Sequence, residues 1–119
     1  MTLKEIMEQK KIAILGNTIE ESKYAYIIKH ELLKYGYNVY CVGKELDSLN
    51  DIKEEIDIID LCIHPAKGIE LLKEFDKKVK CIVVQPGAGS EEIFKYLENN
   101  QIPYIEGCLL EGLRRYVKE

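Results

Sequence analysis

Short apolar segments alternate with helical patterns along this sequence of 119 residues. Strict alternation of this kind predicts parallel strands joined by helical crossovers, and the continuous apolar character of the segments predicts strands buried on both faces. We therefore expect an α/β fold, a doubly wound sheet of about five parallel strands with helices on both faces. The segments predicted as strands are 11–15, 38–42, 58–63, 81–84 and a short one around 104–105.

The helical patterns occupy the intervals between these strands. A short amphipathic helix is expected at about 3–9, and the longest helix at about 22–35, before Gly36. Three later helices carry their own apolar positions, and Ser90 is placed to cap the second of them. The apolar positions expected to face the sheet are Tyr24, Ile27, Ile28, Leu32 and Tyr35, then Ile69, Leu72 and Phe75, then Ile93, Phe94 and Leu97, and finally Leu109, Leu110, Leu113 and Val117.

Length, charge and cysteine spacing narrow the functional classes. The chain has the length of one domain, 1–119, which is too short for separate cofactor and substrate domains. A net charge of −4 without a basic block argues against nucleic-acid binding. No apolar stretch has the roughly 18 residues of a membrane span, and no signal peptide is visible, so we expect a cytoplasmic protein without membrane contact. The four cysteines lack metal-ligand spacing, so no metal site is expected.

Ligands of doubly wound sheets bind outside the carboxyl ends of the strands. The residues that follow the predicted strands are therefore the candidate site. They are Gly16, Asn17 and Thr18, then Gly43 and Lys44, then Ile63, His64 and Pro65, then Gln85, Pro86 and Gly87, and finally Gly107 and Cys108.

The first of these turns admits two interpretations. A strand, a glycine, two small polar residues and a helix are how such folds place a phosphate at a helix N-terminus. The glycine-rich dinucleotide fingerprint is incomplete here, however, and Thr18 with Glu21 matches a helix capping box, which would explain both residues structurally. Glu20 and Glu21 would repel a pyrophosphate unless they point away, and Lys23 offsets part of that charge.

The end of the second strand discriminates among nucleotides. NAD-binding domains usually place an acidic residue there to bind the ribose hydroxyls, whereas this chain has Gly43 and Lys44. A lysine favours a ribose that carries a phosphate, which is on the 2′ oxygen in NADP and on the 3′ oxygen in coenzyme A (CoA). The alternative is that Lys44 is an ordinary surface lysine.

Several segments together, in order and spacing, resemble the small stand-alone CoA-binding domain proteins. That family is related to the N-terminal, Rossmann-like domain of the succinyl-CoA synthetase alpha subunit. The resemblance extends from about Lys11 to Tyr116 and rests on segments 12–18, 32–40, 56–61, 84–88 with Glu91 and Glu92, and 107–109. The chain departs from the family pattern at Ala25, where small members often have a serine, at Ile63 and His64, where an arginine and its neighbour are expected, and at Gly43–Lys44, where many read Asn-Pro.

The resemblance implies CoA or an acyl-CoA as the ligand. It implies that Gly16, Asn17 and Thr18 lie at the pyrophosphate, and that Lys44 is the basic residue after the second strand. Ile63, His64 and Pro65 would then form a loop on the adenine or pantetheine side. The full set of expected ligand-binding residues is Gly16, Asn17, Thr18, Lys23, Gly43, Lys44, Ile63, His64, Pro65, Gln85, Pro86, Gly87 and Cys108.

Two functional classes follow. The favoured one is a non-catalytic binding module for CoA or an acyl-CoA that acts as a sensor, carrier or regulatory module. The alternative is an NADP-linked or cysteine-based redox protein that uses Cys108 at a helix N-terminus. We assign no catalytic residue, because His64 has no identifiable partner nucleophile or carboxylate in the sequence. A nucleotide is the expected small-molecule partner, and a protein partner or homo-oligomer stays open.

Overall fold

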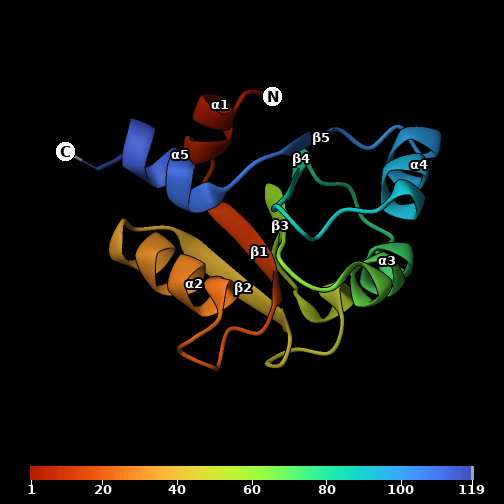
Figure 1. Ribbon diagram of the computed structural model, residues 1–119, viewed down its shortest axis with the longest axis horizontal. Helices are drawn as coiled ribbons and strands as arrows, with labels where there is room; N and C mark the ends of the chain where they lie inside the picture. The colour runs from red at the N-terminus through yellow and green to blue at the C-terminus, as the bar shows by residue number, and fades with distance from the viewer. Residues whose placement is uncertain (119) are drawn as a thin grey trace.

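The computed structural model describes residues 1–118, which form one sheet of five parallel strands with helices packed on both faces (Figure 1). The spatial order is β2-β1-β3-β4-β5, and every neighbouring pair is parallel. The expected α/β doubly wound, Rossmann-like fold is therefore confirmed. The strands are β1 (Lys11–Gly16), β2 (Asn38–Gly43), β3 (Ile58–Leu61), β4 (Cys81–Val84) and β5 (Tyr104–Glu106).

The helices divide between the two faces of the sheet, as Figure 1 shows. One face is covered by α1 (Leu3–Met7), α2 (Tyr24–Lys34) and α5 (Leu109–Tyr116). The other is covered by α3 (Pro65–Glu74) and α4 (Glu91–Asn99), with the short 3₁₀ helix η1 (Leu49–Asp51) beside α3. Right-handed crossovers between parallel strands produce such a two-sided arrangement.

Alternate residues of each strand supply two separate cores. On β1, Ile12 and Ile14 pack under α1, α2 and α5, whereas Ala13 and Leu15 pack under α3 and α4. All four side chains are fully buried. This is the two-sided burial that the continuous apolar segments predict, because successive side chains of a strand point to opposite faces.

The ends of several elements differ from the sequence-based expectation. The N-terminal helix is Leu3–Met7 rather than 3–9, and it begins with a capping box between Thr2 and Glu5. β3 ends at Leu61, two residues earlier than expected. α2 begins at Tyr24, and Tyr24 and Ile27 are 69% and 41% exposed instead of facing the sheet. The buried face of α2 is formed by Ala25, Ile28 and Leu32.

The predicted end of the longest helix is confirmed. Gly36 has a φ of +87°, and the N–H of Tyr37 donates to the carbonyl oxygen of Leu32. This is the left-handed glycine stop that satisfies the last carbonyl groups of a helix. None of the helices formed within residues 1–118 is long and apolar enough to cross a membrane.

Candidate functional site

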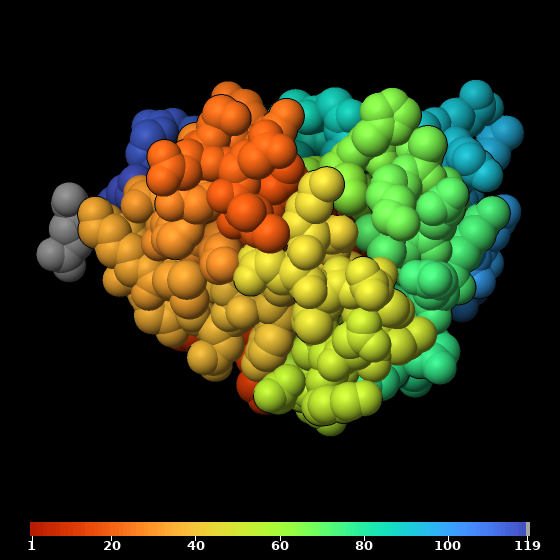
Figure 2. Space-filling model, turned by 90° about the horizontal axis from the view of Figure 1, so that it is seen from below, coloured from red at the N-terminus to blue at the C-terminus, as the bar shows by residue number. Residues whose placement is uncertain are grey.

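A groove of about 260 Å³ crosses the edge of the sheet at which β1, β3 and β4 end. The strand order reverses between β1 and β3, and ligands of open α/β sheets bind at such a switch point. Figure 2 looks onto this edge, with the segment after β1 in orange, the loop after β2 in yellow and the start of α3 in light green. The groove is lined by Asn17, Lys23, Tyr24, Ala25, Cys62, Ile63, His64, Gln85, Pro86, Gly87 and Ala88.

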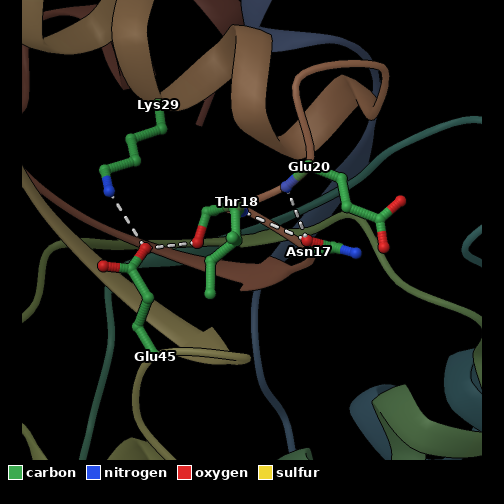
Figure 3. Close-up of polar contacts among 6 residues, drawn as sticks. Asn17, Thr18, Glu20, Lys29 and Glu45 are labelled. Carbon is green, nitrogen blue, oxygen red and sulfur yellow. Dashed lines mark hydrogen bonds and ion pairs between the residues drawn. The ribbon is translucent and has the colours of Figure 1, made fainter.

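The loop that follows β1 passes very close to the end of β3. A Cβ atom at Gly16 would lie 2.5 Å from the carbonyl oxygen of Cys62 and 2.8 Å from the Cβ of Ala25. Only glycine fits this crossing. Next along the chain, the side-chain Oδ1 of Asn17 accepts hydrogen bonds from the N–H groups of Ile19 and Glu20, both at 3.1 Å (Figure 3). Asn17 therefore shapes the loop at the mouth of the groove.

Thr18 is not a helix cap, so the capping-box alternative is wrong. Its hydroxyl donates to the carboxylate of Glu45, which also lies 3.0 Å from the ammonium of Lys29 (Figure 3). The hydrogen bond from Thr18, together with that from Lys29, lowers the pKa of Glu45. Thr18 is 2% exposed and does not line the groove. This contact ties the loop after β1 to the loop after β2.

The N-terminus of α2 opens onto the groove without a side-chain cap. Its N-cap residue is Lys23, and the N–H groups of Tyr24 and Ala25 donate to no acceptor among residues 1–118. Unpaired N–H groups and the positive end of the helix dipole favour an anion at this position. Lys23 and Tyr24 both line the groove, and Lys23 adds a positive charge there.

His64 has a local structural role at the start of α3. Its Nδ1 accepts a hydrogen bond of 3.1 Å from the N–H of Ala66, and Pro65 occupies the first turn of the helix. A neutral imidazole that accepts at Nδ1 carries its proton at Nε2, so His64 retains one donor. Its side chain lines the groove, whereas Pro65 lies in a different depression, between α3 and α4.

Gln85 connects the groove to a buried carboxyl group. Its Nε2 donates a hydrogen bond of 2.8 Å to Oδ1 of Asp60, and Asp60 has no exposed surface. Burial raises the pKa of Asp60 to about 7, although the bond from Gln85 opposes that shift. Oδ2 of Asp60 has no hydrogen-bond partner in the part of the chain that the structure describes. Asp60 is the one polar residue in the predicted strand 58–63, and this interruption of an apolar segment was the signal available in the sequence.

Two expected residues after β2 lie outside the groove. Gly43 has a φ of +127°, and a Cβ there would lie 3.0 Å from the carbonyl oxygen of Gly16, so this residue is needed for close packing of β1 and β2. The next residue, Lys44, is exposed on the same edge of the sheet. Lys44 does not line the groove.

Cys108 lies on a second surface. It is the N-cap residue of α5 and lines a depression of about 670 Å³ between α2 and α5. Tyr24 lines both this depression and the groove, so the two are adjacent. The four cysteines are free thiols, and burial raises the pKa of Cys41 to about 11 and that of Cys62 to about 12. These two side chains stay protonated at neutral pH, which disfavours thiolate chemistry at either position.

Groove residues that the sequence analysis missed are Tyr24, Ala25, Cys62 and Ala88. Helical spacing placed Tyr24 toward the core, but this residue is 69% exposed and lines the groove. Among residues 1–118, no three His, Cys, Asp or Glu side chains gather where they could hold a metal ion.

Solved structures with the same fold match the chain almost from end to end. Prb, a protein redesigned for binding, superposes with a TM-score of 0.82 at 23% identity, covering 98% of this chain and 91% of its own. A hypothetical protein from Pyrococcus horikoshii gives 0.79 at 22% identity, covering 99% and 94%. A protein from Thermus thermophilus gives 0.76 at 22% identity, covering 98% and 99%. At these identities the similarity establishes the fold.

The family comparison adds what the fold alone does not. The family described as CoA binding domain matches residues 10–113, a range that begins just before β1, ends within α5 and contains every residue of the groove. The sheet order, the switch-point groove and the uncapped N-terminus of α2 agree with a family of nucleotide-ligand binding domains. The protein belongs to the CoA binding domain family.

Proposed function

We propose that the protein is a non-catalytic binding module for CoA or an acyl-CoA, with the diphosphate of the ligand at the N-terminus of α2. The observation that carries the proposal is the pair of unpaired N–H groups of Tyr24 and Ala25 beside Lys23, at the switch-point groove of a CoA binding domain. A diphosphate accepts hydrogen bonds from such N–H groups and is stabilised by the helix dipole.

The residues at the two ends of the site suggest where the other parts of CoA would bind. Lys44, which is exposed after β2, would contact the 3′-phosphate of the adenosine end. The pantetheine arm would then run across the groove toward Gln85 and Gly87, where amide groups of the protein can pair with its amides. A groove of about 260 Å³ is below the usual range for a fully enclosed small-molecule pocket, which is about 300–1,000 Å³. Much of the coenzyme would therefore lie on the surface.

A binding role without chemistry fits the groups around the groove. The Nδ1 lone pair of His64 is used to cap α3, and the pKa of Cys62 is raised to about 12 by burial and by the nearby carboxyl of Asp60. Neither side chain is set up as a nucleophile or as a general base. A sensor or carrier that passes its ligand to a partner requires only the binding surface.

A ligand comparison tests the proposal. Thermal unfolding and calorimetric titration would be carried out with CoA, dephospho-CoA, NADP, NAD and ADP at equal concentrations. A ligand that binds only the folded state raises the apparent stability. We expect CoA to give the largest shift and NAD the smallest. The absence of any shift with millimolar CoA would rule out the proposed function, and a larger shift with NADP than with CoA would replace CoA by NADP as the ligand.

A further inference from the structure

A buried carboxyl group, hydrogen-bonded to the groove residue Gln85, is used by no part of the proposed binding function. Asp60 is on β3, between Ile59 and Leu61, which face α3 and α4. Because side chains alternate along a strand, Asp60 faces the opposite core, formed with α1, α2 and α5. Within residues 1–118 its side chain has one hydrogen bond, the one from Gln85, and Oδ2 is buried without a partner. A buried, half-satisfied carboxyl is costly, so it calls for an explanation.

The pKa of Asp60 is set by burial and by the hydrogen bond from Gln85, not by neighbouring charges within residues 1–118. The titratable side chains that belong to this core or pack against it, within residues 1–118, are those of Tyr35, Tyr37, Cys62 and Cys81, and Cys108 lies close to Cys62. Burial raises the pKa of Cys62, Cys81 and Tyr37, so these three are neutral near pH 7. The helices that pack over this core contribute apolar side chains: Ile6 and Met7 from α1, Ala25, Ile28 and Leu32 from α2, and Leu109 and Leu113 from α5.

The Gln85 amide links this carboxyl to the ligand groove through a hydrogen bond. Gln85 follows β4, is 6% exposed and lines the groove. An ionised carboxylate only accepts hydrogen bonds, so it holds Nε2 of Gln85 inward and leaves Oε1 as the acceptor on the groove side. A protonated carboxyl can also donate from its O–H to Oε1, and the amide can then turn and present its N–H₂ group to the groove.

We propose that Asp60 is a positioning residue that sets, by gaining or losing one proton, whether Gln85 offers the groove an acceptor or a donor. The ionised state enforces the acceptor, which pairs with an amide N–H such as those of pantetheine. The protonated state permits both orientations and weakens that pairing. This inference rests on the proposed function for the identity of the ligand, whereas the coupling between Asp60 and Gln85 does not depend on it. The proximity of its pKa to 7 makes both states accessible at neutral pH.

Two measurements separate the coupling from ligand binding. In the free protein, nuclear magnetic resonance between pH 5 and 9 follows the Asp60 carboxyl carbon and the Gln85 side-chain amide. We expect both to titrate with one midpoint near 7, and we expect the Gln85 movement to disappear in Asp60→Asn. Asp57→Asn is the matched control, because Asp57 lies just before β3 and pairs with Lys80 and the N–H of Lys11, far from Gln85. It should leave the Gln85 titration intact.

Calorimetric titration with CoA at pH 6 and pH 8 supplies the second measurement. For each protein, the Kd at pH 6 is divided by the Kd at pH 8. This ratio should be about fivefold larger in the wild type and in Asp57→Asn than in Asp60→Asn. A factor of about five in Kd corresponds to the free energy of one net hydrogen bond. Titration of the ligand's own phosphate affects all three proteins equally and cancels.

Each outcome decides a separate point. Equal ratios in the three proteins, or Gln85 resonances that do not titrate with Asp60, overturn the inference even if CoA binds. A shared titration of Asp60 and Gln85 without CoA binding at either pH supports the coupling and removes the proposed function. Should Asp60→Asn not fold, the wild-type titration alone decides, because two different midpoints would overturn the inference.

Discussion

The ammonium of Lys29 lies 3.0 Å from the carboxylate of Glu45, and this ion pair joins α2 to the loop after β2 (Figure 3). The same carboxylate accepts the hydroxyl of Thr18, so one side chain connects three segments around the edge of the sheet. Glu45 is the acidic residue nearest to the position at which NAD-binding domains bind ribose. It is already occupied by two donors from the protein itself, which agrees with the expectation that NAD is not the ligand.

Replacing Glu45 should destabilise the edge of the sheet at which these three segments meet. Glu45→Ala leaves the buried hydroxyl of Thr18 without its partner, and we expect a loss of about 1–2 kcal/mol in the free energy of unfolding, measured by urea denaturation. The matched control is Glu91→Ala, which breaks an exposed ion pair with Lys95 and should cost less than about 0.5 kcal/mol. Equal losses in the two variants would show that the contact with Thr18 contributes nothing.

Gly16 is the position at which a single methyl group should be most damaging. In Gly16→Ala the new Cβ would lie 2.5 Å from the carbonyl oxygen of Cys62, so β1 and β3 would have to separate. Overpacking of this kind costs about 1–3 kcal/mol and often more when the neighbour is backbone. We expect a fall in Tm of several degrees by differential scanning calorimetry and a weaker site.

Gly107 provides the control for Gly16. A Cβ there would meet only the Cδ1 of Ile105, at 3.8 Å, which is an ordinary van der Waals contact. Gly107→Ala should therefore change the stability by less than about 0.5 kcal/mol. A Gly16→Ala protein that is as stable as Gly107→Ala would contradict the close crossing of β1 and β3.

The buried carboxyl of Asp60 predicts a pH dependence of stability with a definite sign. Its pKa is about 7 in the folded protein and near 3.8 in an unfolded chain, so between these values the folded state binds more protons and stability falls as the pH rises. The stabilisation is complete below the unfolded pKa and is lost as the pH passes the folded pKa. From pH 5.5 to 8.5 this single group should lower the free energy of unfolding by about 2 kcal/mol.

Urea denaturation of the wild type and of Asp60→Asn at both pH values measures this effect. Asparagine does not titrate. Between pH 5.5 and 8.5, the free energy of unfolding of Asp60→Asn should therefore fall by about 2 kcal/mol less than that of the wild type. The pKa of Glu45 is lowered by its bonds to Thr18 and Lys29, and that of Asp57 is lowered by its bonds to Lys80 and Lys11, which outweigh the effect of burial. Their contributions are lost only in acid, outside this pH range. Parallel pH profiles for the two proteins would refute the assignment.

The ribose phosphate is the feature by which Lys44 should recognise CoA. We expect the wild type to bind CoA about tenfold more tightly than dephospho-CoA, because a charged contact to phosphate is lost in the latter. Lys44→Ala should bind both ligands equally in calorimetric titrations. Lys78→Ala removes the same charge from the loop before β4, at the opposite edge of the sheet, and should keep the preference. A preference that survives in Lys44→Ala would place the phosphate elsewhere.

Much of the site could be anticipated because it lies immediately after strands. The turns that follow β1 and β4 each contribute residues to the groove, as does the segment after β3, since the ends of parallel strands meet at one edge whatever their order. Asn17, His64 and Gln85 were found in this way. Lys44 and Cys108 follow strands too, but β2 is an edge strand and Cys108 begins a helix on the other side of Tyr24, so neither lines the groove.

The sequence by itself determined the strands, the helices and the parallel α/β class. Continuous apolar segments can be buried only between two layers, and Gly36 ends a helix by its own conformation. Tertiary structure alone decided the rest, because contacts between distant residues outweigh local patterns. Thr18 and Glu21 match a capping box, yet Thr18 pairs with Glu45, which lies 27 residues away. The pKa of Asp60 is raised to about 7 because the folded sheet and its helices exclude water from the carboxyl, and the hydrogen bond from Gln85 only partly opposes this shift.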